Sequence, residues 1–231
     1  MAGGDSVRSH VAVFAKAPVP GKVKTRLIPK LGEEGAAALH RALVEGALKC
    51  AIAAAVGPVE LWCAPDAGDP FFRECADRLG VRLLSQSEGD LGARIRCAFE
   101  AMLLGGRRAL LIGSDIPAMT PAYLRAADTA LAEGYDAVFG PAEDGGYVLV
   151  GLSRVAPELF EGIDWGGPSV MQATRARIER LGWRHFELPV LWDVDRPEDL
   201  SRSGVPLTGA SRATVRGMRP PGRPRHARRS G

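Results

Sequence analysis

The chain has 231 residues, of which 46% are hydrophobic and 25% charged, values typical of a globular protein with one substantial core. Positions 201–231 hold eight of the 30 Lys and Arg residues and none of the 27 acidic residues, so a mildly acidic body precedes a strongly basic tail. The four cysteines form no C-x-x-C pair, which disfavours a zinc site. Without a secretory signal pattern or an apolar run near the ~18 residues of a membrane span, we expect a cytoplasmic protein with no membrane contact.

Strand-like and helical segments alternate along the chain. Strands are predicted at 10–15, 59–64, 81–84, 109–112, 137–139, 147–150 and 185–188. Helices are predicted at 33–56, 70–79, 91–104, 121–133 and 168–181. Thr120 is a predicted N-cap, and Asp195 is expected to cap a last helix start at 195–199. The alternation predicts a mostly parallel sheet covered on both faces, with ligands bound beyond the carboxyl ends of its strands.

The first predicted strand ends in a loop with four cations within eleven residues: Lys16, Lys22, Lys24 and Arg26. Two prolines and Gly21 keep this loop out of regular structure. A strand that opens into a stiff cationic loop is well suited to hold phosphates. We therefore expect a nucleotide or another phosphorylated ligand at this loop.

Residues 88–94 open the third predicted helix after a strand. Their backbone N–H groups are suited to a base or a phosphate, and Arg94 to an anion. Simple helix capping is the slightly favoured alternative for this segment.

A buried apolar run at 110–112 delivers Asp115 to a predicted strand end. An aspartate there can hold Mg²⁺ or Mn²⁺ against the phosphate oxygens of a ligand. An isolated loop aspartate more often caps a turn, which is the favoured interpretation of the residue alone; the position beyond a buried strand strengthens the metal role and leaves both open.

The strand predicted at 137–139 is followed by two acids, two glycines and an aromatic residue: Glu143, Asp144, Gly145, Gly146 and Tyr147. The glycines allow the backbone to approach a ligand closely. A hairpin turn between two strands accounts for the same residues equally well.

Asp193 and Asp195 lie two positions apart in an extended segment, so their carboxylates share one side of the chain. Either can join Asp115 on a shared cation. Helix capping competes for Asp195, which makes Asp193 the better candidate without settling the choice.

Several enzyme classes are disfavoured by missing motifs. The chain has no G-x-x-x-x-G-K-[ST] loop, no G-x-S-x-G elbow and no H-E-x-x-H pair. A P-loop protein and a hydrolase triad are therefore not expected.

Four motifs occur in a characteristic order: VFAKAPVPGKVKTRL at 13–27, GSDIP at 113–117, EDGGY at 143–147 and DVDRPEDL at 193–200. Together they resemble the nucleotide-diphospho-sugar transferase family of GT-A fold. Some of its members are labelled radical-SAM-associated or arsenosugar-pathway glycosyltransferases, others a domain of unknown function, and phospholactate and molybdenum-cofactor guanylyltransferases look like distant relatives. The resemblance covers roughly residues 10–200.

The resemblance implies a Rossmann-like three-layer α/β/α sandwich with a mostly parallel sheet. We expect one transferase domain at 10–203, after a flexible N-terminus at 1–9 and before a disordered basic tail at 204–231. No aromatic residue interleaves the arginines of that tail, so a nucleic-acid partner is not expected.

The resemblance also assigns roles to residues. It gives donor phosphates and nucleotide to a set from the first loop and the third helix: Lys16, Gly21, Lys22, Lys24, Arg26, Leu91, Gly92 and Arg94. Asp115 becomes the metal ligand, with a second carboxylate from Asp193 or Asp195 because GSD stands where sugar transferases have D-x-D. The acceptor faces Gly145, Gly146, Tyr147 and Trp165, the last in a WGGP element that lacks the family's threonine.

The implied activity is that of a metal-dependent transferase with Mg²⁺ or Mn²⁺, a nucleotide-activated donor and a small-molecule acceptor. Glu143 or Asp144 beside Tyr147 can serve as a base, which favours glycosyl transfer from an NDP-sugar. A guanylyltransferase-like nucleotidyl transfer with pyrophosphate release is the alternative. A catalytically degenerate nucleotide-binding module is a third hypothesis, from a different class.

Overall fold

A computed structural model describes residues 9–104 and 107–204. Seven strands form one sheet in the order β3-β2-β1-β4-β6-β5-β7. Their bounds are β1 (Ser9–Lys16), β2 (Val59–Ala64), β3 (Arg82–Ser85), β4 (Arg108–Gly113), β5 (Ala137–Pro141), β6 (Tyr147–Leu152) and β7 (His185–Glu187). Only β6 pairs antiparallel among these strands, with β4 and β5. The predicted mostly parallel sheet is confirmed.

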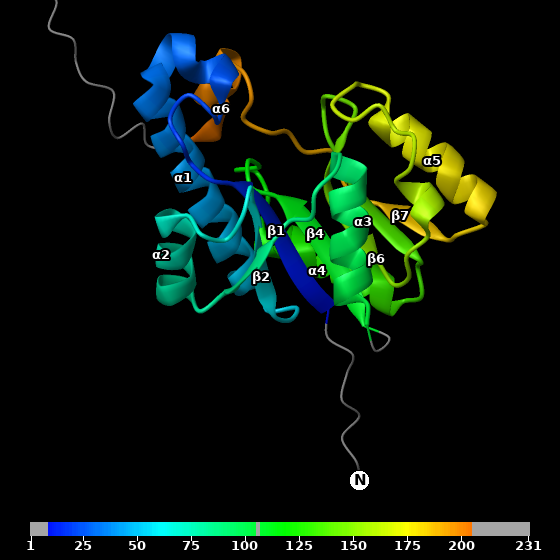
Figure 1. Ribbon diagram of the computed structural model, residues 1–231. Coiled ribbons are helices and arrows are strands. Elements are labelled where there is room, and N and C mark those ends of the chain that lie inside the picture. The colour runs from blue at the N-terminus through cyan, green and yellow to red at the C-terminus, as the bar shows by residue number, and fades with distance from the viewer. Residues whose placement is uncertain (1–8, 105–106, 205–231) are drawn as a thin grey trace, which may run out of the picture.

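Helices cover both faces of the sheet, with α3 in front of it and α4 behind in Figure 1. The helices are α1 (Ile28–Ala54), α2 (Pro70–Leu79), α3 (Leu91–Met102), α4 (Pro121–Ala132), α5 (Val170–Leu181) and α6 (Leu200–Ser203). Short 3-10 helices are η1 (Thr25–Leu27), η2 (Pro157–Leu159) and η3 (Pro197–Asp199). One buried cluster joins α1, α2 and α4 to the sheet, and another joins α3 and α5 to its other face. The three-layer sandwich is thus confirmed.

Alternation along β1 explains why both faces need a cover. Val11 and Val13 belong to the cluster under α1, α2 and α4, whereas Ala12 belongs to the cluster under α3 and α5. Successive side chains of a strand point to opposite faces, so a strand that is apolar at consecutive positions must be buried on both.

Capping side chains mark the starts of α2, α3 and α4. The Thr120 hydroxyl accepts a hydrogen bond from the Tyr123 N–H at 3.2 Å, as its predicted capping role requires. Asp90 caps α3 in the same way, at 2.8 Å from the Ala93 N–H. Helix α1 begins five residues before its predicted start, and the backbone of Gly32 (φ 71°) interrupts its regular geometry. Helix α5 begins two residues late, after the loop at 165–168.

The prediction that Asp195 caps a helix was wrong. The N-cap of η3 is Arg196, and Asp199, the third residue of that helix, bonds back to it: its carboxylate accepts the backbone N–H groups of Asp195 at 3.1 Å and Arg196 at 2.7 Å. The side chain of Asp195 instead forms an ion pair with Arg26.

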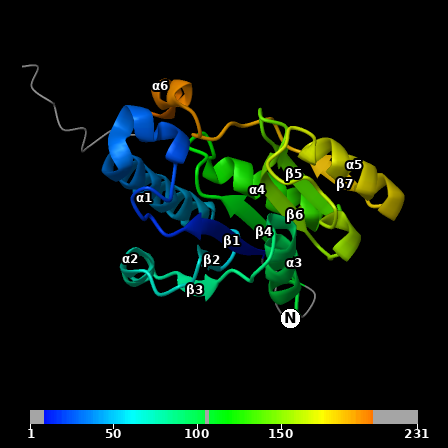
Figure 2. The same ribbon diagram turned by 45° about the horizontal axis from the view of Figure 1, so that its top comes forward.

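The end of the described chain returns to its beginning. Helix α6 lies beside the N-terminal part of α1 (Figures 1 and 2). A small buried cluster holds the two together: Leu27, Leu39, Leu43, Val194 and Leu200. This packing places residues 193–195 opposite the cationic loop. The segments predicted to be flexible or disordered lie outside the described residues, except for Ser9, which begins β1, and Gly204.

Candidate active site

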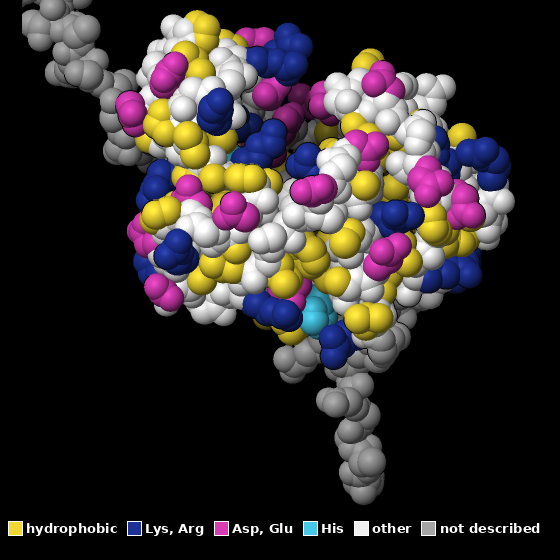
Figure 3. Space-filling view, viewed as in Figure 1, with side chains coloured by type: hydrophobic (Ala, Val, Ile, Leu, Met, Phe, Trp, Pro, Cys, Tyr) yellow, Lys and Arg dark blue, Asp and Glu magenta, His cyan; other side chains and the backbone are white. Residues whose placement is uncertain are grey.

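A cavity of about 490 Å³ lies beyond the carboxyl ends of β1 and β4, where ligands bind in open α/β sheets. We call it the cationic cavity. Its lining includes five basic side chains and two aspartates: Lys16, Lys22, Lys24, Arg26, Arg94, Asp115 and Asp195. In Figure 3 a hollow at the top of the molecule gathers basic and acidic side chains between α1 and α5. The predicted cations and acids therefore meet at one site.

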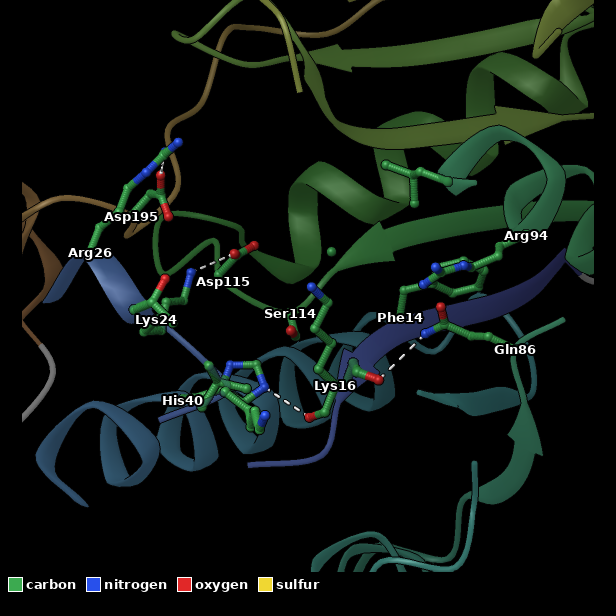
Figure 4. A pocket seen from close by; sticks show the side chains of 16 residues that line it. Phe14, Lys16, Lys24, Arg26, His40, Gln86, Arg94, Ser114, Asp115 and Asp195 are labelled. Carbon is green, nitrogen blue, oxygen red and sulfur yellow. Dashed lines mark hydrogen bonds and ion pairs between the residues drawn. The ribbon is translucent and has the colours of Figure 1, made fainter. Parts of the chain in front are cut away.

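Lys24 is the most constrained residue of the loop. Its backbone adopts a left-handed conformation (φ 47°, ψ 43°), which is uncommon and costly for a residue other than glycine. Its side chain is 7% exposed, and its ammonium nitrogen lies 2.6 Å from Oδ2 of Asp115. Figure 4 shows the two groups directed toward each other. A strained backbone at Lys24 therefore holds its cation against the strand-end aspartate.

Two further cations frame the cavity. Arg26 forms an ion pair with Asp195, which Figure 4 shows at the rim. Arg94 at the start of α3 donates from Nε to the carbonyl of Gly89 at 2.9 Å. This bond orients the guanidinium and leaves its two terminal nitrogens available to an anion.

Two lining residues escaped the sequence analysis. His40 is buried in α1, and its Nε2 lies 2.9 Å from the carbonyl oxygen of Lys16. Burial lowers the pKa of His40, so the ring is neutral at pH 7 and Nε2 donates to that carbonyl. Gln86, after β3, donates to the carbonyl of Trp62 at 2.8 Å. Both contacts join residues 24 positions apart, so no short motif could have indicated them.

A second cavity, of about 740 Å³, continues from the first toward the ends of β2 and β3. It shares five lining residues with the cationic cavity: Lys16, Lys22, Val23, Gln86 and Arg94. Ser87 also lines it, with a buried hydroxyl that has no protein partner in the described part of the chain. Together, the cationic cavity suits the phosphates of a nucleotide, and the larger second cavity suits its nucleoside.

A third cavity, of about 170 Å³, lies on the other side of Asp115. We call it the acidic cavity. Asp115, Asp144 and Asp193 line it, together with Tyr147 and Trp165. Asp115 lines both this cavity and the cationic one, so it stands at their junction.

Asp193 is electrostatically strained. Burial raises the pKa of Asp193 to about 6, and the like charges of Asp115 and Asp144 add to the rise. Within 9–104 and 107–204, no group of three or more His, Cys, Asp or Glu side chains is arranged to hold a metal ion. Mg²⁺ commonly takes only one or two protein carboxylates and completes its shell with phosphates and water. Asp115, which pairs with Lys24 through Oδ2, and Asp193 line the same cavity and are the pair that fits such an ion; Asp195 lines only the cationic cavity.

The turn between β5 and β6 is a hairpin and also lines the acidic cavity. Asp144 accepts the Gly146 N–H at 2.9 Å, which closes the turn. Gly145 has a φ of +89°, and a Cβ there would lie 2.0 Å from the carbonyl oxygen of Pro168. Gly145 therefore serves the packing of the turn on the loop at 165–168, whereas Gly146, Tyr147 and Trp165 line the cavity.

Four residues proposed for the site line none of the three cavities: Glu143, Gly92, Gly21 and Gly145. Glu143 is exposed, and both its oxygens bind Arg202 at 2.9 Å. This pair holds the pKa of Glu143 below its usual value, which suits a base poorly. A Cβ on Gly92 would lie 2.5 Å from the Phe160 carbonyl oxygen, so this glycine serves close packing. Gly21, with a φ of +76°, shapes the cationic loop and does not line a cavity. Leu91 lines both the cationic and the acidic cavity.

A Rossmann-like sandwich with a cationic loop after β1 and an aspartate after β4 defines the class of transferases that act on nucleotides or nucleotide sugars. The chain belongs to the family DUF2064, described as an uncharacterized protein conserved in bacteria, whose model matches residues 47–167. The resemblance inferred from the four motifs is consistent with this assignment.

Among the helices of the described residues, none combines the length and the apolar character that a membrane span requires.

Similar proteins support the enzyme class. Phosphoenolpyruvate guanylyltransferase from Streptosporangium roseum is 33% identical over 193 residues, which cover 77% of this chain and 80% of that protein. A structure from Desulfovibrio desulfuricans G20, named for a proposed nucleotide-diphospho-sugar transferase, is 32% identical, with a TM-score of 0.76 over 88% of this chain and 91% of that one. A nucleotidyl transferase from Methanothermobacter, 18% identical with a TM-score of 0.58 over 84% of this chain and 95% of that one, shares the fold. The predicted transferase is confirmed.

Proposed function

We propose that this protein transfers a group from a nucleotide-activated donor with the help of Mg²⁺ or Mn²⁺. The observation that carries the proposal is the convergence of Lys16, Lys22, Lys24 and Arg94 with Asp115 in one cavity at the ends of β1 and β4. A pyrophosphate needs positive charge around its oxygens. The cations of the loop supply it on one side, and a metal ion held by the strand-end carboxylate can supply it on the other. The cavity toward β2 and β3 then receives the nucleoside.

Asp115 and Asp193 would hold the divalent ion, which when bound would offset part of the charge of the donor pyrophosphate. The protein supplies the remaining positive charge. Lys22 and Arg94 line both donor cavities, and Lys24 places its ammonium within reach of any phosphate that approaches Asp115. Stabilising the leaving pyrophosphate oxygens in this way requires no covalent help from a nucleophile.

Glycosyl transfer from an NDP-sugar is the activity we favour. An acceptor hydroxyl has to lose a proton during that reaction, and a carboxylate near it is the usual base. Asp144 lies in the acidic cavity and uses one oxygen, Oδ1, to close the hairpin turn. Its second oxygen is therefore the group we assign to the acceptor. Glu143, the other carboxylate considered for this role, is held by Arg202 outside the cavity.

Nucleotidyl transfer is the second candidate, and the relative from Streptosporangium roseum favours it. That protein is a guanylyltransferase by name and shares 33% of the aligned residues. In such a reaction the acceptor attacks the α-phosphorus of an NTP and pyrophosphate leaves. The donor cavities described above would serve either reaction, because both place a diphosphate between the loop and Asp115.

Product analysis separates the two activities. The full chain is incubated with Mg²⁺ or Mn²⁺, a panel of acceptors, and either the four NTPs or a set of NDP-sugars. Release of NDP from a nucleotide sugar supports glycosyl transfer, and release of pyrophosphate from an NTP supports the second candidate. Asp115→Asn serves as the inactive control. Tight binding of both donor types without turnover of either would favour a degenerate nucleotide-binding module and contradict the proposal.

A further inference from the structure

We infer that the acceptor is a small molecule that is uncharged or cationic and carries hydroxyl or amino groups, rather than a phosphorylated or carboxylated anion. The inference rests on the proposed function, because it takes the acidic cavity as the acceptor side of the site. The property concerned is the charge of the acceptor. The relative from Streptosporangium roseum is named for phosphoenolpyruvate, an anion, and we infer the opposite preference for this chain.

The charges that line the acidic cavity are all negative. Its lining has three carboxylates, Asp115, Asp144 and Asp193, and no Lys, Arg or His within the described ranges. Lys24 is the cation next to this set; it pairs with Asp115 at 2.6 Å, and it lines the cationic cavity on the donor side of Asp115. With Asp115 and Asp193 given to the ion that holds the donor, Asp144 remains as an uncompensated charge facing the acceptor.

The basic residue behind the cavity is also committed. Burial raises the pKa of the Tyr147 hydroxyl, and Arg177 in α5 is near enough to offset part of that rise. However, its guanidinium donates to the carbonyl oxygens of Glu161 at 2.7 Å, Gly162 at 3.0 Å and Ala173 at 3.0 Å. These bonds hold it on the backbone of the helix and the preceding turn, and it does not line the acidic cavity.

Two residues that line the cavity also carry buried polar groups without a protein partner. The hydroxyl of Tyr147 and the Nε1 of Trp165 are buried and make no hydrogen bond with any residue of the described chain. Burying such groups without a partner costs free energy, which a ligand that pairs with them can recover. The two rings stand perpendicular, with centroids 6.2 Å apart, and form an apolar wall beside these groups.

These features together select the ligand. Carboxylates accept hydrogen bonds from O–H and N–H groups, while a second anion in a partly buried site meets repulsion that costs about a factor of ten in affinity or more. The volume of about 170 Å³ admits only a small molecule or one end of a larger one. A polyol or an amino alcohol can pair with both the unpartnered donors and the carboxylates, whereas a phosphorylated acid can pair with the donors but is repelled by the carboxylates.

Three pyranoses that differ in charge provide the test: glucose, glucosamine and glucuronate. Their dissociation constants are measured by ligand-detected NMR on the full chain in the presence of Mg²⁺. We expect glucuronate to bind at least about tenfold more weakly than glucose, and glucosamine to bind at least as tightly as glucose. Asp144→Asn should reduce the penalty on glucuronate about threefold or more, because the amide keeps the turn but removes the charge.

Asp164→Asn is the matched control, since Asp164 is exposed, next to Trp165, and outside the lining of the cavity. Its order of affinities should equal that of the unmodified chain. Binding of glucuronate or phosphoenolpyruvate as tight as that of glucose would overturn the inference, as would no binding of glucose and glucosamine, or no effect of Asp144→Asn. Calorimetry with GTP and UDP-glucose on the same sample keeps the tests separate: failure there contradicts the proposed function, whatever the pyranoses show.

Discussion

At the level of single residues, Asp193 is a carboxylate that lowers the stability of the fold at neutral pH and is proposed to bind the metal ion. A carboxylate that is half-buried beside two others is held at a cost, because its charged form is disfavoured by both burial and repulsion. In solution its usual pKa is 3.8, and in the folded chain it is about 6. The folded state therefore binds more protons than the unfolded state between these values, and stability from this group falls as the pH rises through them.

Asp193→Asn should consequently make the metal-free protein more stable at neutral pH. The shift corresponds to roughly 3 kcal/mol, which we reduce to about 1 kcal/mol because water screens a group that is only half-buried. We expect a Tm about 2–4 °C above that of the unmodified chain at pH 7 and no difference at pH 4. Thermal unfolding in EDTA at the two pH values measures this. A lower Tm for the variant at pH 7 would show that Asp193 is a stabilising partner.

Addition of Mg²⁺ to the same samples extends the test. An ion that binds only the folded state raises the Tm of the unmodified chain by mass action. The variant lacks one of the two proposed ligands and should gain less. An equal gain for both would place the ion elsewhere.

Lys24 makes a second residue-level prediction from its φ of 47°. Lys24→Gly removes the charge and relieves a strain of about 1 kcal/mol, whereas Lys24→Met removes the charge and keeps the strain. We expect both variants to bind GDP or UDP at least about tenfold more weakly, with the glycine variant about 1 kcal/mol more stable than the methionine variant. Denaturant unfolding and calorimetry give the two quantities. Undiminished nucleotide binding by either variant would exclude Lys24 from the donor site.

At the level of elements, the acidic cavity exists because three of them approach closely. The start of α3, the hairpin turn between β5 and β6, and the loop at 165–168 meet through glycines. A Cβ on Gly92 would come within 2.7 Å of Trp165 Nε1, and one on Gly145 within 2.0 Å of Pro168. Glycine at these two positions lets backbone and indole approach to distances that any side chain would prevent.

Gly92→Ala should therefore destabilise the fold by about 1–3 kcal/mol, since the Phe160 carbonyl oxygen in its way is backbone and cannot simply rotate aside. Gly46→Ala in α1 is the matched control. Gly46 is exposed in the helix, and a Cβ there meets nothing within 4 Å. That substitution should stabilise by about 0.5–1 kcal/mol. Urea unfolding of both variants decides the matter, and a neutral Gly92→Ala would contradict the packing described.

The sequence indicated the elements well because their signals are local. Thr120 with Pro121, and Asp90 before α3, mark helix starts within a few residues of the bonds they make. Contacts between distant residues carried no such signal. His40 on Lys16, Gln86 on Trp62 and Arg202 on Glu143 join residues 24, 24 and 59 positions apart. Asp195 shows the same limit, since its side chain pairs with Arg26, 169 positions away, and Arg196 is the N-cap of η3 in its place.

At the level of the whole molecule, the proposed function depends on the last described segment packing back against the N-terminal part of the fold. The segment at 193–200 follows every strand of the sheet, yet it packs through Val194 and Leu200 on α1. The backbone N–H of Val194 also donates to the Asp115 carbonyl at 2.9 Å. Acids near the end of the fold thereby face cations near its start, across the hollow seen in Figure 3. The family resemblance anticipated this meeting, and only the packed structure accounts for it.

Calorimetric titration of GDP and UDP, with Mn²⁺ and with EDTA, tests the central proposal that the loop and Asp115 grip a diphosphate through a shared ion. For the unmodified chain we expect binding of at least one nucleotide that weakens about tenfold or more in EDTA. Asp115→Asn should show only the weak, metal-independent binding, with circular dichroism and Tm that report an intact fold. Nucleotide binding that is equally tight in EDTA, or in Asp115→Asn with Mn²⁺, would contradict the account.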